Sequence, residues 1–211
     1  MLDIQKLNAS IGATSILREV SLQVGAGRMV GLIGRNGSGK TTLLRTIMGH
    51  VAGQGRMQFD GTDLHATEPY HRAELGIGYM PEDRKLVPEF SVTQNILLPT
   101  WSVDMPDATE RLEWIYELMP EIAKFSQRKA LVLSGGQQKL VALGRALMVG
   151  RKLLALDEPF EGLAPALARR LGEVMVDLQS EGVSMIISDS SEHHVNDLLD
   201  DKYIIERGSI L

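Results

Sequence analysis

The sequence contains no cysteine, and it has no long hydrophobic run. Without thiols the chain can form neither a disulfide nor a thiolate metal site, and it has no cysteine nucleophile. Its purely apolar runs, such as 153–156 and 185–187, are a few residues long, whereas a helix that spans a bilayer needs about 20 residues. The opening MLDIQKLNAS has no apolar stretch of signal-peptide length. We therefore expect a cytoplasmic chain that does not cross a membrane by itself.

An excess of positive charge is also missing, because the net charge is −5. Broad binding to nucleic acid depends on clustered Lys and Arg, so we expect no nucleic-acid partner. Hydrophobic residues at 44% and charged residues at 23% are close to the averages for globular proteins. A chain of 211 residues can bury a substantial core. These values predict one compact domain.

Short apolar runs typical of β-strands alternate with helical patterns along much of the chain, which favours an α/β fold with a mostly parallel sheet. The strands expected in this sheet are 28–34, 76–80, 152–157, 183–188 and 202–208. The first 25 residues and the segment 55–61 resemble short alternating strands of a smaller antiparallel sheet, with a turn at Asp60 and Gly61.

The pattern changes in the middle of the chain. The segment SVTQ, 91–94, has the serine-to-glutamine spacing of a capping box, and 108–125 carries apolar residues three and four positions apart. Both features predict helices. We therefore expect residues 1–82 and 134–211 to form an α/β core with its antiparallel part, and residues 83–133 to form a helical subdomain. Together they would make one domain over the whole chain.

A phosphate-binding loop is predicted at GRNGSGKT, 34–41, because it fits G-x-x-x-x-G-K-[ST] between an expected strand and an expected helix. Glycines let the backbone curl so that N–H groups point at phosphate oxygens, and the helix N-terminus adds partial positive charge. Lys40 would reach the β- and γ-phosphates, and the Thr41 hydroxyl would bind Mg²⁺. The alternative is a glycine-rich turn without a ligand. The expected nucleotide-binding residues are Gly34, Arg35, Asn36, Gly37, Ser38, Gly39, Lys40, Thr41 and Thr42.

Two acids, Asp157 and Glu158, follow the apolar run in KLLALDEP. A buried strand would carry both to the carboxyl edge of the sheet, where ligands bind in open α/β folds. Asp157 would hold Mg²⁺, and Glu158 would orient or deprotonate the water that attacks the γ-phosphate. For an isolated Asp-Glu pair, a solvated acidic turn after a core strand would be the preferred explanation. The phosphate loop in the same chain favours the catalytic role for Glu158.

A third motif, LSGGQQ at 133–138, precedes a helical run. Ser134 and the N–H groups of Gly135 and Gly136 would offer an anion site at a helix start, although a plain helix cap would also explain them. In the order GRNGSGKTT, YMPE, LSGGQ and LLALDEP, the sequence resembles the ATP-binding cassette (ABC) family over nearly the whole chain.

This resemblance implies a P-loop NTPase core that binds and hydrolyses ATP with Mg²⁺. It implies a dimer, with an identical or a related cassette, in which ATP lies between the phosphate loop of one copy and Ser134, Gly135, Gly136 and Gln137 of the other. Closure and reopening of that dimer would drive separate transmembrane permease subunits, and indirectly a solute-binding receptor, at the inner face of the cell membrane. Glu82 stands in place of the family's usual glutamine, where it would reach the metal; an acid on a surface loop is the alternative.

Two stretches narrow the resemblance. GIGYMPEDR, 76–84, together with DEPFEGLAP, 157–165, resembles the ATPases of importers for branched-chain amino acids and related amides. SSEHHVNDLLDDK, 190–202, is instead similar to the second cassette of sugar importers. We therefore expect the ATPase subunit of an importer, most simply for branched-chain amino acids or related small polar solutes.

Three positions depart from the family's pattern. Ile11 stands where an aromatic residue often stacks on adenine, Ala164 where an aspartate is frequent, and Ser191 where a histidine usually contacts the γ-phosphate. A catalytically weak cassette that acts as a regulatory subunit therefore stays open. His193 or His194 could replace the missing histidine, or both could be surface residues. A non-transport ABC ATPase is a further alternative, although the sequence has neither a long coiled coil nor a second cassette.

Overall fold

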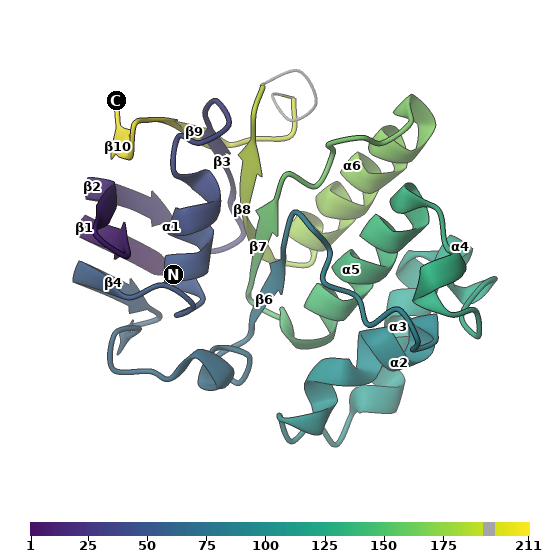
Figure 1. Cartoon of the computed structure of the whole chain (residues 1–211). Helices are drawn as coiled ribbons and strands as arrows, with labels where there is room; N and C mark the ends of the chain where they lie inside the picture. Colours follow the sequence, from purple (N-terminus) through teal and green to yellow (C-terminus); the bar gives the residue numbers. More distant parts are fainter. Residues whose placement is uncertain (192–196) are drawn as a thin grey trace.

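Six strands form a mostly parallel sheet through the middle of the molecule (Figure 1). The computed structural model describes residues 1–191 and 197–211. The strands are β3 (Met29–Ile33), β6 (Ile77–Met80), β7 (Leu153–Asp157), β8 (Ser184–Asp189), β9 (Asp201–Glu206) and β10 (Ser209–Ile210). Their order is β10-β9-β3-β8-β7-β6, and only the pair of β10 and β9 is antiparallel among them. Each strand predicted for this sheet is confirmed, with small shifts at the ends.

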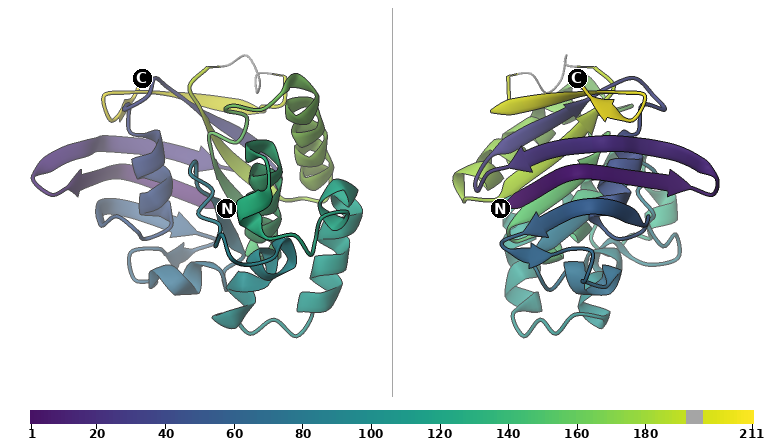
Figure 2. Two further views of the ribbon diagram at one scale, coloured as in Figure 1. Left: turned by 45° about the vertical axis from the view of Figure 1, so that its right-hand side comes forward. Right: turned by 90° about the vertical axis from the view of Figure 1, so that its left-hand side faces the viewer.

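A second, antiparallel sheet packs beside it. Its strands are β1 (Leu2–Ile11), β2 (Thr14–Val24), β4 (Gly53–Phe59) and β5 (Thr62–Asp63), in the order β2-β1-β4-β5. Asp60 and Gly61 make the predicted turn, with φ of 49° and 82°. The expectation of short strands was wrong for β1 and β2, which form the long hairpin seen in Figure 2. Lys6 has a φ of 47° at a shift in strand register, and such a bulge lets pairing continue where the alternation of apolar residues breaks.

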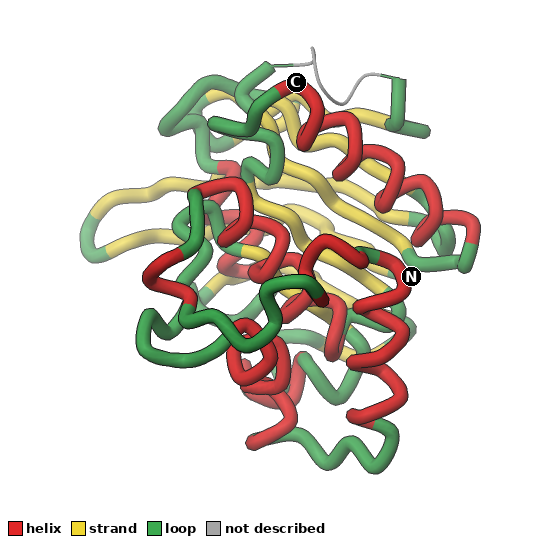
Figure 3. The backbone as a smooth tube through the Cα atoms, turned by 90° about the vertical axis from the view of Figure 1, so that its right-hand side faces the viewer, coloured by secondary structure: helices red, strands yellow, loops and turns green. Residues whose placement is uncertain are grey.

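Helix α1 (Lys40–Ile47) lies between the two sheets, while α5 (Gly135–Val149) and α6 (Pro165–Ser180) cover the other face of the larger sheet (Figures 1 and 3). The central strands are buried on both faces, so alternate residues enter two cores. Met29 and Ile33 pack with α5 and α6, whereas Val30 and Leu32 pack with α1 and the smaller sheet. This double burial holds the carboxyl ends of the strands in place.

The middle of the chain is helical, as predicted, and it packs on α5. Its helices are α2 (Val92–Leu97), α3 (Ala108–Leu118) and α4 (Pro120–Ala123), and the 3₁₀ turns of the chain are η1 (Pro69–Arg72), η2 (Leu98–Trp101) and η3 (Ala130–Val132). Ser91 and Gln94 form the expected capping box. The segment 108–125 is mainly helical, as predicted, with α3 and α4 separated at Met119 (φ −130°, ψ 72°). Pro120 disfavours the helical conformation in the residue before it. Among the described helices, none combines the length and apolar composition needed to span a bilayer.

Candidate nucleotide-binding site

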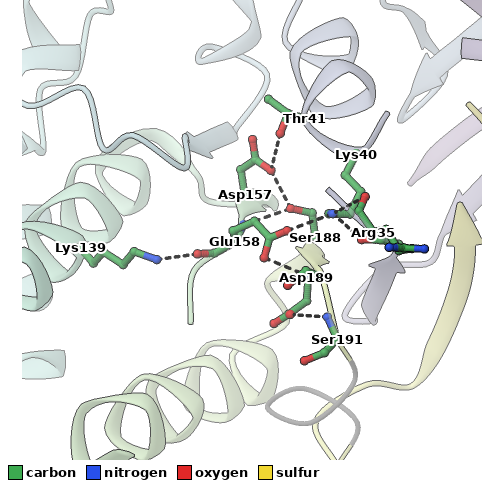
Figure 4. A network of polar contacts seen from close by, with 11 residues as sticks. Arg35, Lys40, Thr41, Lys139, Asp157, Glu158, Ser188, Asp189 and Ser191 are labelled. Carbon is green, nitrogen blue, oxygen red and sulfur yellow. Dashed lines mark hydrogen bonds and ion pairs between the residues drawn. The ribbon is translucent and has the colours of Figure 1, made fainter. Parts of the chain in front are cut away.

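The ends of parallel strands bring the candidate residues to one edge of the larger sheet. Ile33 of β3 lies opposite Asp189 of β8, and Asp157 of β7 lies opposite Ser188 of β8. The backbone N–H of Gly34 donates to the carbonyl oxygen of Asp189 at 3.1 Å, which ties the start of the phosphate loop to β8. The loop and the two acids, which lie far apart in the sequence, therefore meet (Figure 4).

The phosphate loop has the tight curl that its glycines predict. Gly37 and Gly39 have φ of 79° and 113°, in the left-handed region that favours glycine. At Gly34 the limit is space, because a Cβ would lie 2.3 Å from the carbonyl oxygen of Ile205. The loop leads directly into α1, so its backbone and the N-terminus of that helix adjoin the same space.

A cavity of about 310 Å³ lies between this loop and the acids. Lys40, Thr41, Glu82 and Glu158 all line it, as the sequence analysis expected of residues that meet one nucleotide. Ile16 supplies an apolar part of the wall. The cavity therefore combines a cation, a hydroxyl and carboxylates at the carboxyl edge of the sheet.

Asp157 is fully buried, and its carboxylate is held from three directions. The Oδ1 atom accepts hydrogen bonds from Ser188 Oγ at 2.6 Å and from Thr41 Oγ1 at 3.2 Å. The Oδ2 atom accepts one from the Tyr79 hydroxyl at 3.4 Å. Burial, followed by the charge of Asp157, raises the pKa of Tyr79, so the phenol stays a donor. Asp157 thus has one orientation, with its carboxylate against the Thr41 hydroxyl.

The oxygen donors at this edge suit Mg²⁺ that arrives with a triphosphate. Asp157 and Thr41 meet at 3.2 Å, and Glu82 lines the same cavity. Mg²⁺ is usually bound through one or two carboxylates together with phosphate oxygens, rather than in an all-protein cage. In agreement, residues 1–191 and 197–211 contain no group of three or more His, Asp or Glu side chains able to hold a metal ion.

Lys40 and Glu158 form a buried ion pair, with Lys40 Nζ 3.0 Å from Glu158 Oε1. The ammonium of Lys40 also donates to the carbonyl oxygens of Gly34 and Arg35. Glu158 Oε2 accepts from the backbone N–H of Ser190 at 3.1 Å. Burial raises the pKa of the Glu158 carboxyl, and Lys40 opposes that rise. A phosphate group that engages Lys40 must therefore compete with Glu158.

The other predicted nucleotide contacts, at residues 134–137, do not lie at this cavity. Ser134 Oγ accepts from the backbone N–H of Gln137 at 3.3 Å, and Gln137 Oε1 accepts from the Ser134 N–H at 2.9 Å. This is a capping box at the start of α5. Ser134 and Gly135 are exposed, and none of the described residues that line the cavity belongs to 134–137. The expected nucleotide contacts thus fall into two separate groups in one chain.

The departures from the family pattern lie in different places. Ile11 is 53% exposed at the tip of the β1–β2 hairpin, and Ile16, rather than Ile11, lines the cavity. Ala164 is the exposed N-cap of α6. Ser191 follows β8 at the site edge, where its N–H donates to Asp189 Oδ1 at 2.9 Å. The two candidate replacements, His193 and His194, lie outside the described residues.

Ser188 holds both acids in position and was not predicted from the sequence. Its Oγ donates to Asp157 and accepts from the backbone N–H of Glu158 at 3.0 Å. A signal was present, because Ser188 is a polar residue at the end of an apolar strand expected to run parallel to the strand ending in Asp157. Lys139 was also missed; its ammonium donates to the carbonyl oxygen of Glu158 at 2.7 Å. Only the fold places Lys139 beside this edge.

Comparison with known proteins identifies a family. A family model described as "ABC transporter" matches residues 17–161. The high-affinity branched-chain amino acid transport ATP-binding protein BraG of Pseudomonas aeruginosa is 33% identical, over 100% of this chain and 91% of that protein. The probable branched-chain amino acid transport ATP-binding protein LivG of Methanocaldococcus jannaschii is 33% identical, over 95% and 84%. The lipopolysaccharide export system ATP-binding protein LptB of Haemophilus influenzae is 30% identical, over 100% and 89%.

Solved structures have the same architecture. A nucleotide-free ATP-binding cassette from an ABC transporter superposes with a TM-score of 0.87 at 29% identity, covering 100% of this chain and 89% of that chain. The ADP conformation of an ATP-binding cassette of an ABC transporter gives 0.86 at 30% identity, with the same coverage. A dimeric bacterial ABC transporter cassette, at 21% identity and a TM-score of 0.89, covers 100% and 96% and shares the fold.

Proposed function

This chain belongs to the ABC transporter family and is an ATP-hydrolysing subunit of it, and on that premise we propose that it drives solute import through separate transmembrane permease subunits. One observation carries the catalytic part of the proposal. Lys40 and Thr41 from one segment meet Asp157 and Glu158 from another at one sheet edge, beside a cavity. A regulatory cassette with a degenerate site would have no need to keep this set together.

Each residue has a definite task in this proposal. The backbone of residues 34–39 and the ammonium of Lys40 hold the triphosphate. Thr41, Asp157 and Glu82 would hold Mg²⁺, which neutralises charge on the phosphates when it is bound. Glu158 orients the attacking water and accepts its proton, a role suited to a carboxyl whose pKa is raised by burial.

A second cassette completes the site. The capping box of α5 leaves Ser134 and Gly135 exposed at a helix N-terminus, away from the cavity of their own chain. Such a terminus favours an anion. We propose that the residues 134–137 of one copy close over the triphosphate held by the other, in a dimer with an identical or a related cassette. The dimeric structure of a cassette with the same fold supports a dimer.

The permease subunits would dock on the helical part of the chain. The rings of Phe90 and Trp101 lie 5.5 Å apart, and Trp101 is 66% exposed. Leu131 and Val132, which are 52% and 63% exposed, lie next to Pro88 and Phe90 through backbone hydrogen bonds of the 88–90 and 130–131 segments. Contiguous exposed apolar side chains mark interaction surfaces. The proposal thus treats residues 83–133 as the part of a single 1–211 domain that meets the permease, at the inner face of the cell membrane.

The direction and the solute are narrower proposals. Relatives named for branched-chain amino acid transport support import of branched-chain amino acids or related small polar solutes, with a solute-binding receptor acting through the permease. Export is the second candidate, because a relative named for lipopolysaccharide export is 30% identical over the whole chain. The two directions make different demands on the permease rather than on the ATPase site.

Hydrolysis is tested with the purified chain. Wild type should hydrolyse ATP only with Mg²⁺, and Glu158→Gln should lower turnover by roughly 10² to 10⁴-fold, the range for a lost general base. ATP binding should persist, and the variant should accumulate as a dimer on gel filtration. The control is Glu173→Gln, on the exposed side of α6. Normal turnover by Glu158→Gln would remove Glu158 from this role, and the absence of wild-type turnover would favour the regulatory alternative.

Direction is tested with the chain bound to its co-purified permease in lipid vesicles that present the ATPase to the added ATP. Import predicts that labelled leucine supplied with the receptor on the opposite side crosses toward the ATPase. The Glu158→Gln complex should transport none. ATP-dependent extraction of lipopolysaccharide, without leucine movement, would instead establish export.

A further inference from the structure

Glu158 has a backbone conformation that its surroundings impose. Its φ is 48°, in the left-handed region that is uncommon for residues other than glycine. Such a conformation persists only where neighbouring groups hold it. The N–H of Glu158 donates to Ser188 Oγ at 3.0 Å and lies 3.2 Å from the Ser188 carbonyl oxygen. On the other side, its own carbonyl oxygen accepts from Lys139 Nζ at 2.7 Å.

Lys139 is an unusual choice for this contact. Its side chain is only 4% exposed, and burial of an ammonium is costly when its partner is a neutral carbonyl. Burial lowers the pKa of Lys139, against the opposing charges of Glu161, Glu158 and Glu82. A merely space-filling role would be met more favourably by an apolar side chain, as at Leu140.

The position of Lys139 along α5 gives the contact its meaning. Lys139 lies in the second turn of the helix that begins at Gly135, directly after the capping box of Ser134. From there its side chain reaches across to the Glu158 peptide (Figure 4). A helix start moves as a unit with its first turns, so a displacement of the residues 134–137 also displaces the ammonium that holds Glu158.

We propose that Lys139 is a positioning residue for hydrolysis, which fixes the Glu158 peptide and transmits the position of the residues 134–137 to the Glu158 carboxylate. This inference rests on the proposed function, because it takes Glu158 as the general base and 134–137 as the contact to a second copy's nucleotide. The two nucleotide sites of the dimer would then be coupled. When residues 134–137 of one chain contact the nucleotide held by the partner copy, they adjust Glu158 beside the nucleotide held by their own chain.

The first test compares Lys139→Met with Lys139→Arg in the full-length chain. Lys139→Met should lower kcat by roughly 10- to 100-fold, the range for a misplaced catalytic group. The KM for ATP should change by no more than about twofold, because the phosphate loop is untouched. The cooperativity of hydrolysis with ATP concentration should also fall. Lys139→Arg, which keeps a cationic donor, should recover most of the turnover. The matched control is Lys152→Met, an exposed lysine bonded to Asp60.

A double-mutant cycle separates positioning from a general structural role. If Lys139 acts through the Glu158 carboxylate, Lys139→Met should cause little further loss in single-turnover hydrolysis when Glu158→Gln is already present. Thermal unfolding of each variant checks that the chain is folded. If Lys139→Met does not fold, Lys139→Gln, which is neutral and polar, takes its place in the same cycle.

The outcomes are distinct. The inference would be overturned, and the proposed function left standing, if Lys139→Met hydrolysed ATP at the wild-type rate. It would also be overturned if Lys139→Met lowered the single-turnover rate by the same factor with and without Glu158→Gln. An equal loss in Lys139→Arg and Lys139→Met would also overturn it. Absence of Mg²⁺-dependent turnover in the wild type would instead reject the proposed function on which the inference rests.

Discussion

In the proposal, the sheet edge beside the phosphate loop of one copy and residues 134–137 of another copy, the signature turn, bind the same anion, yet the two regions are built in opposite ways. At the edge, Lys40, Asp157 and Glu158 are buried, and the bonds of Lys40 with Glu158 and of Thr41 with Asp157 join segments that lie far apart in the sequence. At the turn, Ser134 and Gly135 are exposed, and the hydrogen bonds of Ser134 stay within one turn of helix. The polar groups of the edge bond between distant segments, whereas those of the turn bond locally and stay exposed to a ligand brought from outside.

This difference predicts that the same substitution will have different effects on stability and activity in the two regions. In the buried edge a substitution should cost stability as well as activity, because its groups hold each other. In the exposed turn a substitution should cost activity more than stability. Each of the following experiments compares the two regions or isolates one group in the edge.

The largest expected contrast comes from two glycine-to-alanine variants. At Gly34 a Cβ would lie 2.3 Å from the Ile205 carbonyl oxygen and 2.6 Å from Ser38 Oγ, so Gly34→Ala should lower the free energy of unfolding by about 3 kcal/mol. At Gly135 the nearest atom is 3.5 Å away, on Arg84, so Gly135→Ala should change it by less than about 0.5 kcal/mol while lowering turnover. Urea unfolding and ATPase assays measure both. Equal losses of stability would erase the distinction between the regions.

A smaller contrast is expected from two serine-to-alanine variants. Ser188→Ala removes one buried hydrogen bond from the Asp157 carboxylate and one from the Glu158 N–H, which should cost about 2 kcal/mol of unfolding free energy. Ser134→Ala removes a helix cap at the surface and should cost about 1 kcal/mol. Chemical denaturation of both variants gives the comparison. A larger loss of unfolding free energy in Ser134→Ala would show that the turn, rather than the edge, depends more on its serine for stability.

The smallest effect is a dependence on pH within the edge. Burial raises the pKa of Glu158 above the ordinary value of 4.5, so the folded wild type binds this proton more tightly than the unfolded chain. Its unfolding free energy therefore falls as pH rises through the window between those two values. Glu158→Gln lacks this loss and should gain stability relative to wild type over the same window. Urea titrations from about pH 4 to about pH 8 test the trend, with Glu173→Gln as the reference.

Local signals in the sequence were sufficient to predict the signature turn and the phosphate loop, but not the residues that position Asp157 and Glu158. The signature turn is a capping box that four consecutive residues specify, and the glycines of the phosphate loop impose its curl locally. Ser188 could be found only through the pairing of its strand with the strand that ends in Asp157, and Lys139 only through the packing of α5 beside that strand end. The separation of α3 from α4 at Met119 also has a local cause, since Pro120 follows it.

The pairing of Lys40 with Glu158 also bears on timing. While the ammonium neutralises the carboxylate, that carboxylate is a poor base and does not deprotonate a neighbouring water. A γ-phosphate that draws Lys40 away leaves Glu158 buried without its counterion, which raises the proton affinity of the carboxylate. If Glu158 is the general base, as proposed, ATP therefore activates the group that hydrolyses it, and the ion pair suppresses proton transfer before ATP binds.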